Sequence, residues 1–402
     1  MNETMHPQRA EPPLALPMSA FLDDAPSSFV PPQITQKRFS VISWVGGIVE
    51  WCFGLACLLV MLAVLASIPI LQFFSLGYLL ESGGRIARTG KLREGLIGIR
   101  TAARFGGMIV CCWLFLLPVR FVADLARSAA LIEPDSPVAK NWRFGLLALT
   151  ALTVFHLVTA LANGGRIRHF LSPFNLYFIV RKMIAGGFYQ RTRDAVWDAV
   201  MDLRLAYYFR LGLLGFVAAM AWILIPVTLI ALGRSTIPLA PLFGIAGAFL
   251  LAFVVMYLPF MQLRFAQLNQ FLAAFNLLEI RRVYARAPWM FAFAFIMTLL
   301  FALPLYLLKI EVVPQEAAWL PSLVFILFIY PSRLLAGWAL ARATRRETPR
   351  HWFFRWTGRL PFLPVAAFYV LVIFFTQFTS WSGIWSLYEQ HAFSLPVPFV
   401  GL

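Results

Sequence analysis

Long apolar runs, separated by short polar segments, dominate this sequence. Eight of them are about 20 residues long or longer, the length that an α-helix needs to cross the hydrocarbon of a bilayer. The runs are Trp44–Leu80, Phe105–Ala123, Trp142–Ala162, Tyr208–Leu232, Ile237–Leu263, Trp289–Leu308, Trp319–Ala341 and Leu360–Trp381. The pattern predicts an all-α protein, a polytopic integral membrane helical bundle with about eight transmembrane helices.

The first apolar run leaves an alternative open. The stretch Ser40–Gly84 is long enough for two helices that meet at Ser67–Pro69, since proline interrupts a helix. Two crossings there would give nine transmembrane helices and would place the amino terminus in the cytoplasm rather than outside. Every later loop would keep its side of the membrane.

Composition and charge agree with residence in a bilayer. Charged residues make up 13% of the chain, against about a quarter in an average soluble domain, so the chain lacks the polar surface to cover itself in water. Of its 34 Lys and Arg residues, 24 lie in the segments Glu81–Arg104, Asn163–Arg210, Arg264–Arg286 and Arg342–Arg359. With eight crossings these four segments share one face, the cytoplasmic one by the positive-inside rule. We therefore expect a multi-pass protein of the cytoplasmic membrane, with basic residues that face anionic lipid headgroups and no nucleic acid.

The expected organisation has four parts. Residues 1–39 are polar and proline-rich and form a disordered tail. Residues 40–233 form a first membrane unit, with a cytoplasmic amphipathic insertion at 172–207. Residues 234–385 form a second unit, and residues 386–402 are a tail. The two units resemble each other, because Gln72–Arg88 aligns without gaps with Gln270–Arg286. A parallel duplication of a four-helix unit would explain this, and chance similarity among Leu- and Arg-rich helix ends is the alternative.

Several polar residues lie within apolar runs, where they are costly and by default suggest function. Arg333 is the deepest cation, and we expect it to face a carboxylate, backbone carbonyls freed by Pro331, or water. Gln262, Asn269 and Asn276 recur every seven residues, so they would share one helix face as interhelical amide bonds or as a cavity lining. His156 is a candidate proton carrier or, more simply, a hydrogen-bonded packing residue.

Two charged stripes would lie at the cytoplasmic boundary. Glu81, Arg85 and Arg88 are spaced at one helix face, and so are Glu279, Arg282 and Arg286. Each stripe would form Glu–Arg pairs worth a few tenths of a kcal/mol. They are either anchors at the membrane surface or equivalent charges at the cytoplasmic mouth of a cavity.

No motif points to a reaction. The chain has no glycine-rich nucleotide loop, no H-E-x-x-H and no G-x-S-x-G. Its four cysteines lack zinc-ligand spacing and lie in apolar runs. We therefore expect neither metal nor cofactor, and an enzyme is the third of the functional hypotheses.

The stretch LGYLLESGGRIARTGKLREGLIGIRTAARFGG, within Ser67–Met108, resembles bacterial polytopic membrane-protein families of unknown function. In these families an apolar run ends in Gly-Tyr and aliphatic residues, and a basic turn with glycine follows. The resemblance covers about a tenth of the chain and implies a multi-pass membrane protein without an assigned activity.

Two functions lead. The first is transport of a small, anionic or amphiphilic solute, and the second is a non-catalytic scaffold that binds anionic lipids or partner membrane proteins, including a second copy of itself. A water-accessible cavity lined by Arg333 and the Gln262 face would favour transport. A solid bundle in which Arg333 is fully paired would favour the scaffold.

Overall fold

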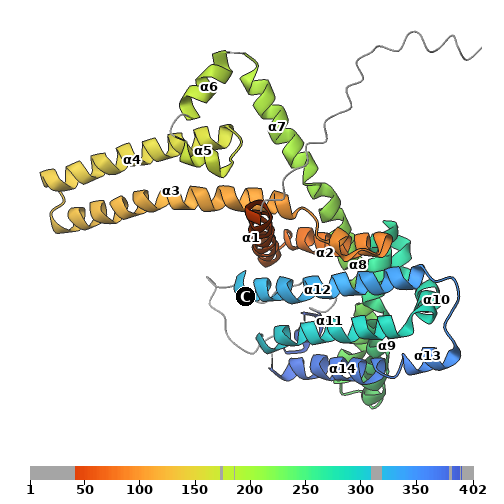
Figure 1. Cartoon of the computed structure of the whole chain (residues 1–402). Helices are drawn as coiled ribbons and strands as arrows, with labels where there is room; N and C mark the ends of the chain where they lie inside the picture. The colour runs from red at the N-terminus through yellow and green to blue at the C-terminus, as the bar shows by residue number, and fades with distance from the viewer. Residues whose placement is uncertain are drawn as a thin grey trace, which may run out of the picture. The chain divides into compact units, whose positions relative to one another are not determined.

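The computed structural model describes residues 41–172, 175–184, 186–308, 319–379, 383–389 and 391. All regular elements in these residues are helices, so the predicted all-α class is confirmed (Figure 1). In chain order they are α1 (Val41–Ser67), α2 (Gln72–Thr89), η2 (Leu92–Gly95), α3 (Ile99–Ile132), α4 (Pro137–Ala162), α5 (Ile167–Leu171), α6 (Asn175–Ile184), α7 (Phe188–Asp202), α8 (Leu205–Leu232), α9 (Ala240–Leu268), η3 (Phe271–Phe275), α10 (Leu277–Arg286), α11 (Pro288–Leu308), α12 (Trp319–Thr344), α13 (Trp352–Thr357), α14 (Phe362–Thr379), η5 (Gly383–Trp385) and α15 (Ser386–Glu389). The expected tail at 1–39 lies outside the described residues, as does most of the tail at 386–402.

Seven helices of the described chain are long and apolar enough to cross a membrane. They are Trp44–Ser67, Ile99–Ile132, Pro137–Ala162, Val200–Leu232, Ala240–Leu268, Leu320–Thr344 and Trp352–Phe378. An eighth arises if α10 and the part of α11 up to Pro304, which meet at a bend of 110°, are counted as one broken span. The polytopic architecture predicted from the apolar runs is thus confirmed.

The first apolar run contains a break. α1 ends at Ser67 and α2 begins at Gln72, with Ile70 in the left-handed region at φ 71°. Pro69 lies in the turn, as expected of a residue without an amide hydrogen. Two helices therefore meet where the nine-span alternative placed them, but α2 is not among the candidate spans. α2 carries Glu81, Arg85 and Arg88, and its residues 75–84 are buried against other helices rather than exposed to lipid.

Close approach of backbones holds α2 among α8, α9 and α12. A Cβ atom added at Gly77 would lie 1.8 Å from the backbone oxygen of Tyr208 on α8. One added at Gly83 would lie 2.9 Å from the backbone oxygen of Arg333 on α12, and one at Gly84 would lie 3.0 Å from Ala266 on α9. Glycine at these positions lets three helices pack directly on α2, which is how small residues act at helix crossings in membranes.

α3 and α4 form a different kind of pair. They pack on each other, and none of the 18 residues in the most apolar stretch of α3 is buried. Their side chains, such as Phe121 and Phe144, are largely exposed. Apolar side chains at this exposure indicate helices whose outer surface contacts lipid.

One backbone path occurs twice. α2 ends at Gly90 in the left-handed region, Lys91 is extended (φ −108°, ψ 120°), and η2 follows. α9 ends at Asn269 in the left-handed region, Gln270 is extended (φ −119°, ψ 117°), and η3 follows. In this register, offset by 179 residues, Phe74, Tyr78, Leu79, Arg85 and Ala87 match Phe253, Tyr257, Leu258, Arg264 and Ala266.

The register differs from the alignment found in the sequence. Gln72–Arg88 lies within one helix, α2, whereas Gln270–Arg286 comprises an extended residue, η3 and α10. The two segments are therefore not structural equivalents, and Glu81 and Glu279 do not occupy matching positions. Leu and Arg recur so often at helix ends of this chain that a gapless match can arise one helix away from the structural one.

Candidate functional site

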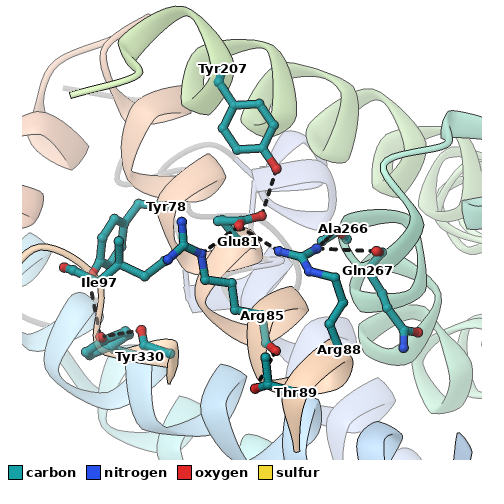
Figure 2. Close-up of polar contacts among 11 residues, drawn as sticks. Tyr78, Glu81, Arg85, Arg88, Thr89, Ile97, Tyr207, Ala266, Gln267 and Tyr330 are labelled. Carbon is teal, nitrogen blue, oxygen red and sulfur yellow. Dashed lines mark hydrogen bonds and ion pairs between the residues drawn. The ribbon is translucent and has the colours of Figure 1, made fainter. Parts of the chain in front are cut away.

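A buried polar joint forms where α2 meets α8 and α9. At its centre is Glu81, whose side chain is 5% exposed (Figure 2). Its Oε1 accepts hydrogen bonds from Arg85 Nε at 2.9 Å and from Arg88 Nη2 at 2.7 Å. Its Oε2 accepts one from the Tyr207 hydroxyl of α8 at 2.7 Å. A carboxylate withdrawn from water requires such charge-assisted bonds, and here both of its oxygens have them.

The spacing of α2 explains the first two bonds. Arg85 and Arg88 follow Glu81 by four and seven residues, so all three lie on one helix face. The predicted pairing of Glu81 with both arginines is confirmed. The two arginine side chains are 34% and 38% exposed. The carboxylate of the joint is therefore buried, whereas its two guanidinium groups are partly exposed to solvent.

Arg88 and Gln267 link α2 to α9 reciprocally. Arg88 Nη1 donates to the backbone oxygens of Ala266 at 2.8 Å and Gln267 at 3.3 Å. In return Gln267 Nε2 donates to the backbone oxygen of Ala87 at 3.0 Å. In the 179-residue register Arg88 matches Gln267 and Ala87 matches Ala266, so each helix end satisfies a carbonyl of the other. These last-turn carbonyls lack partners within their own helices or have capacity for a second bond.

In the second charged set, which begins with Glu279, the carboxylate pairs with an arginine of α9 rather than with the arginines of α10. Arg264 Nη1 donates to Gln267 Oε1 at 2.8 Å, and its Nη2 pairs with Glu279. Asn276 accepts the backbone amide of Glu279 at 3.1 Å and thereby caps α10. Glu279 is thus paired with α9 across the η3 turn. Arg282 is exposed, and the backbone oxygen of Arg286 accepts from Arg346 Nη1 at 3.4 Å. Glu279, Arg282 and Arg286 do lie on one helix, α10, as expected, but the ion pair of Glu279 is with Arg264.

The amide face expected from the heptad spacing of Gln262, Asn269 and Asn276 does not form. α9 ends at Leu268, so Gln262 is inside the helix and fully buried, while Asn269 and Asn276 lie in exposed turns beyond it. A seven-residue spacing places residues on one face only while the helix continues. Asn269 itself ends it by adopting the left-handed conformation, which asparagine tolerates better than most residues.

Arg333 lies in the interior, as its depth in the seventh apolar run predicted. It is 2% exposed, and its Nη1 donates to Gln262 Oε1 at 2.8 Å. This amide oxygen is a partner that was not among the expected ones. Around it α12 packs tightly on α2, because a Cβ atom at Gly337 would lie 2.3 Å from the backbone oxygen of Gly83.

His156 joins α4 to α5. Its Nε2 donates to the backbone oxygen of Phe170 at 2.8 Å, and its ring lies 4.9 Å from that of Phe115 on α3. The contacts are those of a packing residue, the simpler of the two roles expected for it. It lies on the α3–α4 pair and belongs to no other polar cluster described above.

Sequence reasoning missed three tyrosines of the joint. The Tyr78 hydroxyl donates to the backbone oxygen of Ile97 at 2.9 Å and lies 3.3 Å from that of Tyr330, which donates to the oxygen of Gly95 at 3.1 Å. Together they fasten the η2 turn to α2 and α12 (Figure 2). The third, Tyr207, bonds Glu81. Tyr78 and Tyr207 lie at the ends of apolar runs, where tyrosine is common for unrelated reasons. Tyr330 lies in the middle of a run, and its spacing gave no sign of a partner.

The polar contacts of the joint connect helices to one another. In the described part of the chain no three His, Cys, Asp or Glu side chains come together as a metal site. The carboxylate of Glu81 accepts hydrogen bonds from three donors, and the guanidinium of Arg88 bridges two helices. These contacts hold helices together and leave no free acid–base pair within the joint.

Comparison with known proteins adds no relative. No protein-family model matches the chain, and no curated protein or solved structure matches it either. The resemblance of Ser67–Met108 to bacterial membrane families therefore stays a prediction.

Proposed function

We propose that this multi-pass membrane protein is a non-catalytic scaffold, which presents a basic cytoplasmic surface to anionic lipids. The observation that supports this most directly is the environment of Arg333. Its guanidinium is buried and bonded to Gln262 at the crossing of α2 and α12. The deepest cation of the chain therefore serves helix packing, as expected of a scaffold.

The other intramembrane polar groups support the same proposal. Glu81, Arg88 and Gln267 bridge helices α2, α8 and α9, and His156 bridges α4 and α5. A transporter must open a path between helices during its cycle. Opening one between α2 and α12 would separate backbones in direct contact at Gly83 and Gly337.

Lipid binding is proposed because the arginines outside the joint remain accessible. Arg93, Arg100, Arg281, Arg282, Arg346 and Arg350 are all exposed and belong to the basic segments. Each basic residue near an anionic surface contributes about 1 kcal/mol of attraction. Several together would enrich anionic lipids around the protein.

The test is lipid selectivity of the full chain in phosphatidylcholine bilayers. Spin-labelled phosphatidylglycerol and spin-labelled phosphatidylcholine are compared by the fraction of each label immobilised at the protein surface. The proposal expects a larger immobilised fraction for phosphatidylglycerol, reduced by high salt because exposed charges are screened. Equal fractions for the two lipids would contradict it. Solute uptake by proteoliposomes above that of protein-free vesicles, lost in Arg333→Met, would support transport in its place.

A further inference from the structure

A cluster of arginines and aromatic residues lies apart from the buried joint. It comprises α10, the segment 345–351, α13 and the following turn to Leu360, and we call it the α10–α13 surface. Its arginines are Arg281, Arg282, Arg286, Arg345, Arg346, Arg350, Arg355 and Arg359. Its acidic residues are Glu279, which is paired with Arg264, and Glu347. The surface is therefore strongly cationic.

Backbone contacts bring these segments together from distant parts of the chain. The amide of Arg350 donates to the backbone oxygen of Ala285 at 2.9 Å, at the end of α10. A Cβ atom at Gly358 would lie 2.7 Å from Pro288, the first residue of α11. The arginines of α10 and of α13 thus belong to one continuous surface.

Four large aromatic side chains of α13 are exposed next to these arginines. Trp352, Phe353, Phe354 and Trp356 are 58%, 53%, 44% and 62% exposed. A soluble surface would not leave four such side chains on one short helix in water. Tryptophan among arginines is typical of the headgroup level of a membrane, where the ring meets acyl chains and the cations meet phosphate.

Two guanidinium groups lie over aromatic rings. Arg350 lies over the Phe354 ring at 5.9 Å, and Arg359 lies over the Tyr284 ring at 5.9 Å. A cation near the face of an aromatic ring is attracted to it without using up its N–H donors. Arg355 Nε and Arg359 Nε are buried and have no hydrogen-bond partner among the described residues. The two arginine side chains as a whole are partly exposed, so their outer guanidinium nitrogens lie near the surface.

We propose that the α10–α13 surface binds the phosphate groups of anionic phospholipids. The planar fork of arginine matches two phosphate oxygens, and the exposed tryptophans would insert beside the acyl chains. The aromatic side chains favour a lipid headgroup over a soluble phosphate, because a soluble ion gives them no apolar surroundings. This inference rests on the proposed scaffold function and assigns its lipid contact to particular residues.

The test compares two matched double variants of the full chain in the selectivity measurement. Arg355→Gln with Arg359→Gln removes two charges from the α10–α13 surface. Arg127→Gln with Arg143→Gln removes two exposed charges from α3 and α4, outside it and outside the basic segments. We expect the first pair to lower the preference for phosphatidylglycerol at least about five-fold, the effect of one basic residue at an anionic surface, and the second pair to lower it less than two-fold.

Further arms separate the possible outcomes. Arg355→Lys with Arg359→Lys keeps both charges. We expect it to retain only part of the preference for phosphatidylglycerol, because lysine lacks the planar pair of donors that binds two phosphate oxygens. Equal losses in both glutamine pairs, or full preference in the lysine pair, would overturn the assignment while leaving the scaffold function standing. No preference in the unmodified protein would remove the scaffold function itself. Inorganic phosphate that displaced the labelled lipid at equal concentration would overturn the lipid as the ligand.

Discussion

Glu81 shows what one residue does for the packing of this protein. Its carboxylate is almost dry and accepts three hydrogen bonds, two from its own helix and one from Tyr207, which is 126 residues away in the chain. A neutral residue there would leave the Arg85 and Arg88 side chains near the interior without a counter-charge. Removing one partner of a buried pair destabilises more than forming the pair stabilises.

We therefore predict that Glu81→Gln destabilises the protein by about 3 kcal/mol, the lower end of the range for a broken buried pair, because both arginines reach water. The measurement is thermal unfolding of the purified protein in a neutral detergent. Glu94→Gln is the matched control, since Glu94 is exposed on η2, and its melting temperature should stay within error of the unmodified protein. A Glu81→Gln protein that melts with the control would show that the joint is not stabilising.

Single residues also show the limits of reading this sequence. The interior position of Arg333 and the pairing of Glu81 with Arg85 and Arg88 could be predicted, because both follow from depth in an apolar run and from local helix spacing. The amide face of Gln262, Asn269 and Asn276 could not, because Asn269 ends the helix on which the spacing depended. Partners such as Gln262 for Arg333 and Tyr207 for Glu81 could not be predicted either, since tertiary packing alone brings them together.

At the level of helices, small residues decide which elements touch. α2 crosses α8 where Gly77 faces the backbone of Tyr208, and Gly212 faces that of Phe73 at 1.9 Å from an added Cβ atom. Two glycines from opposite helices thus remove side chains from the same crossing. This crossing could not be predicted from the sequence, because the chain has 25 glycines and nothing in their spacing indicates which two lie against each other.

Gly77→Ala should disrupt that crossing, because its methyl group would overlap a backbone oxygen that cannot move without shifting α8. We expect the variant to lose the monodisperse peak in size-exclusion chromatography or to melt at least about 5 °C lower, as a loss of a few kcal/mol would produce. Gly107→Ala on α3 is the control, since nothing lies within 4 Å of its added Cβ atom. Equal stability of the two variants would refute the close crossing.

The repeated turn is also a property of elements. A left-handed residue, an extended residue and a short 3₁₀ helix follow both α2 and α9, and the two helix ends exchange hydrogen bonds through Arg88 and Gln267. Five residues of α2 are identical to their counterparts in the 179-residue register. Sequence identity is a weak sign of this similarity, because most positions in both helices need only be apolar. The shared backbone conformation of the two turns is the stronger sign.

For the whole molecule, about eight crossings were predicted, and the described residues contain seven candidate spans, or eight if the bent pair is counted as one. The eight apolar runs correspond to seven long helices plus the bent pair of α10 and α11. The expected first run became α1 and a buried α2, since a run of apolar residues does not distinguish lipid from protein as its surroundings. If α1 through α14 alternate sides as eight crossings, the turn after α2 and the turn before α13 share one side of the membrane.

Cysteine labelling in sealed cells tests that arrangement. Arg93→Cys and Arg350→Cys should stay unlabelled by a membrane-impermeant maleimide added outside, whereas Asp135→Cys, between α3 and α4, should react. All three positions are exposed, so accessibility within the protein does not limit the reaction. The unmodified protein, whose four cysteines lie on α1 and α3, is the background control. Outside labelling of Arg93→Cys or Arg350→Cys would contradict the topology.

The burial of α2 has a consequence for how the protein is made. A ribosome delivers α2 long before α8, α9 and α12, yet those later helices supply Tyr207, the Ala266 carbonyl and the glycine-lined crossings that surround it. With Glu81, Arg85 and Arg88 on one short helix, α2 is poorly suited to enter lipid alone. Its final placement must therefore wait until α12 has been synthesised, so a chain released early would carry an unsheltered charged helix and would be a natural target for membrane quality-control proteases.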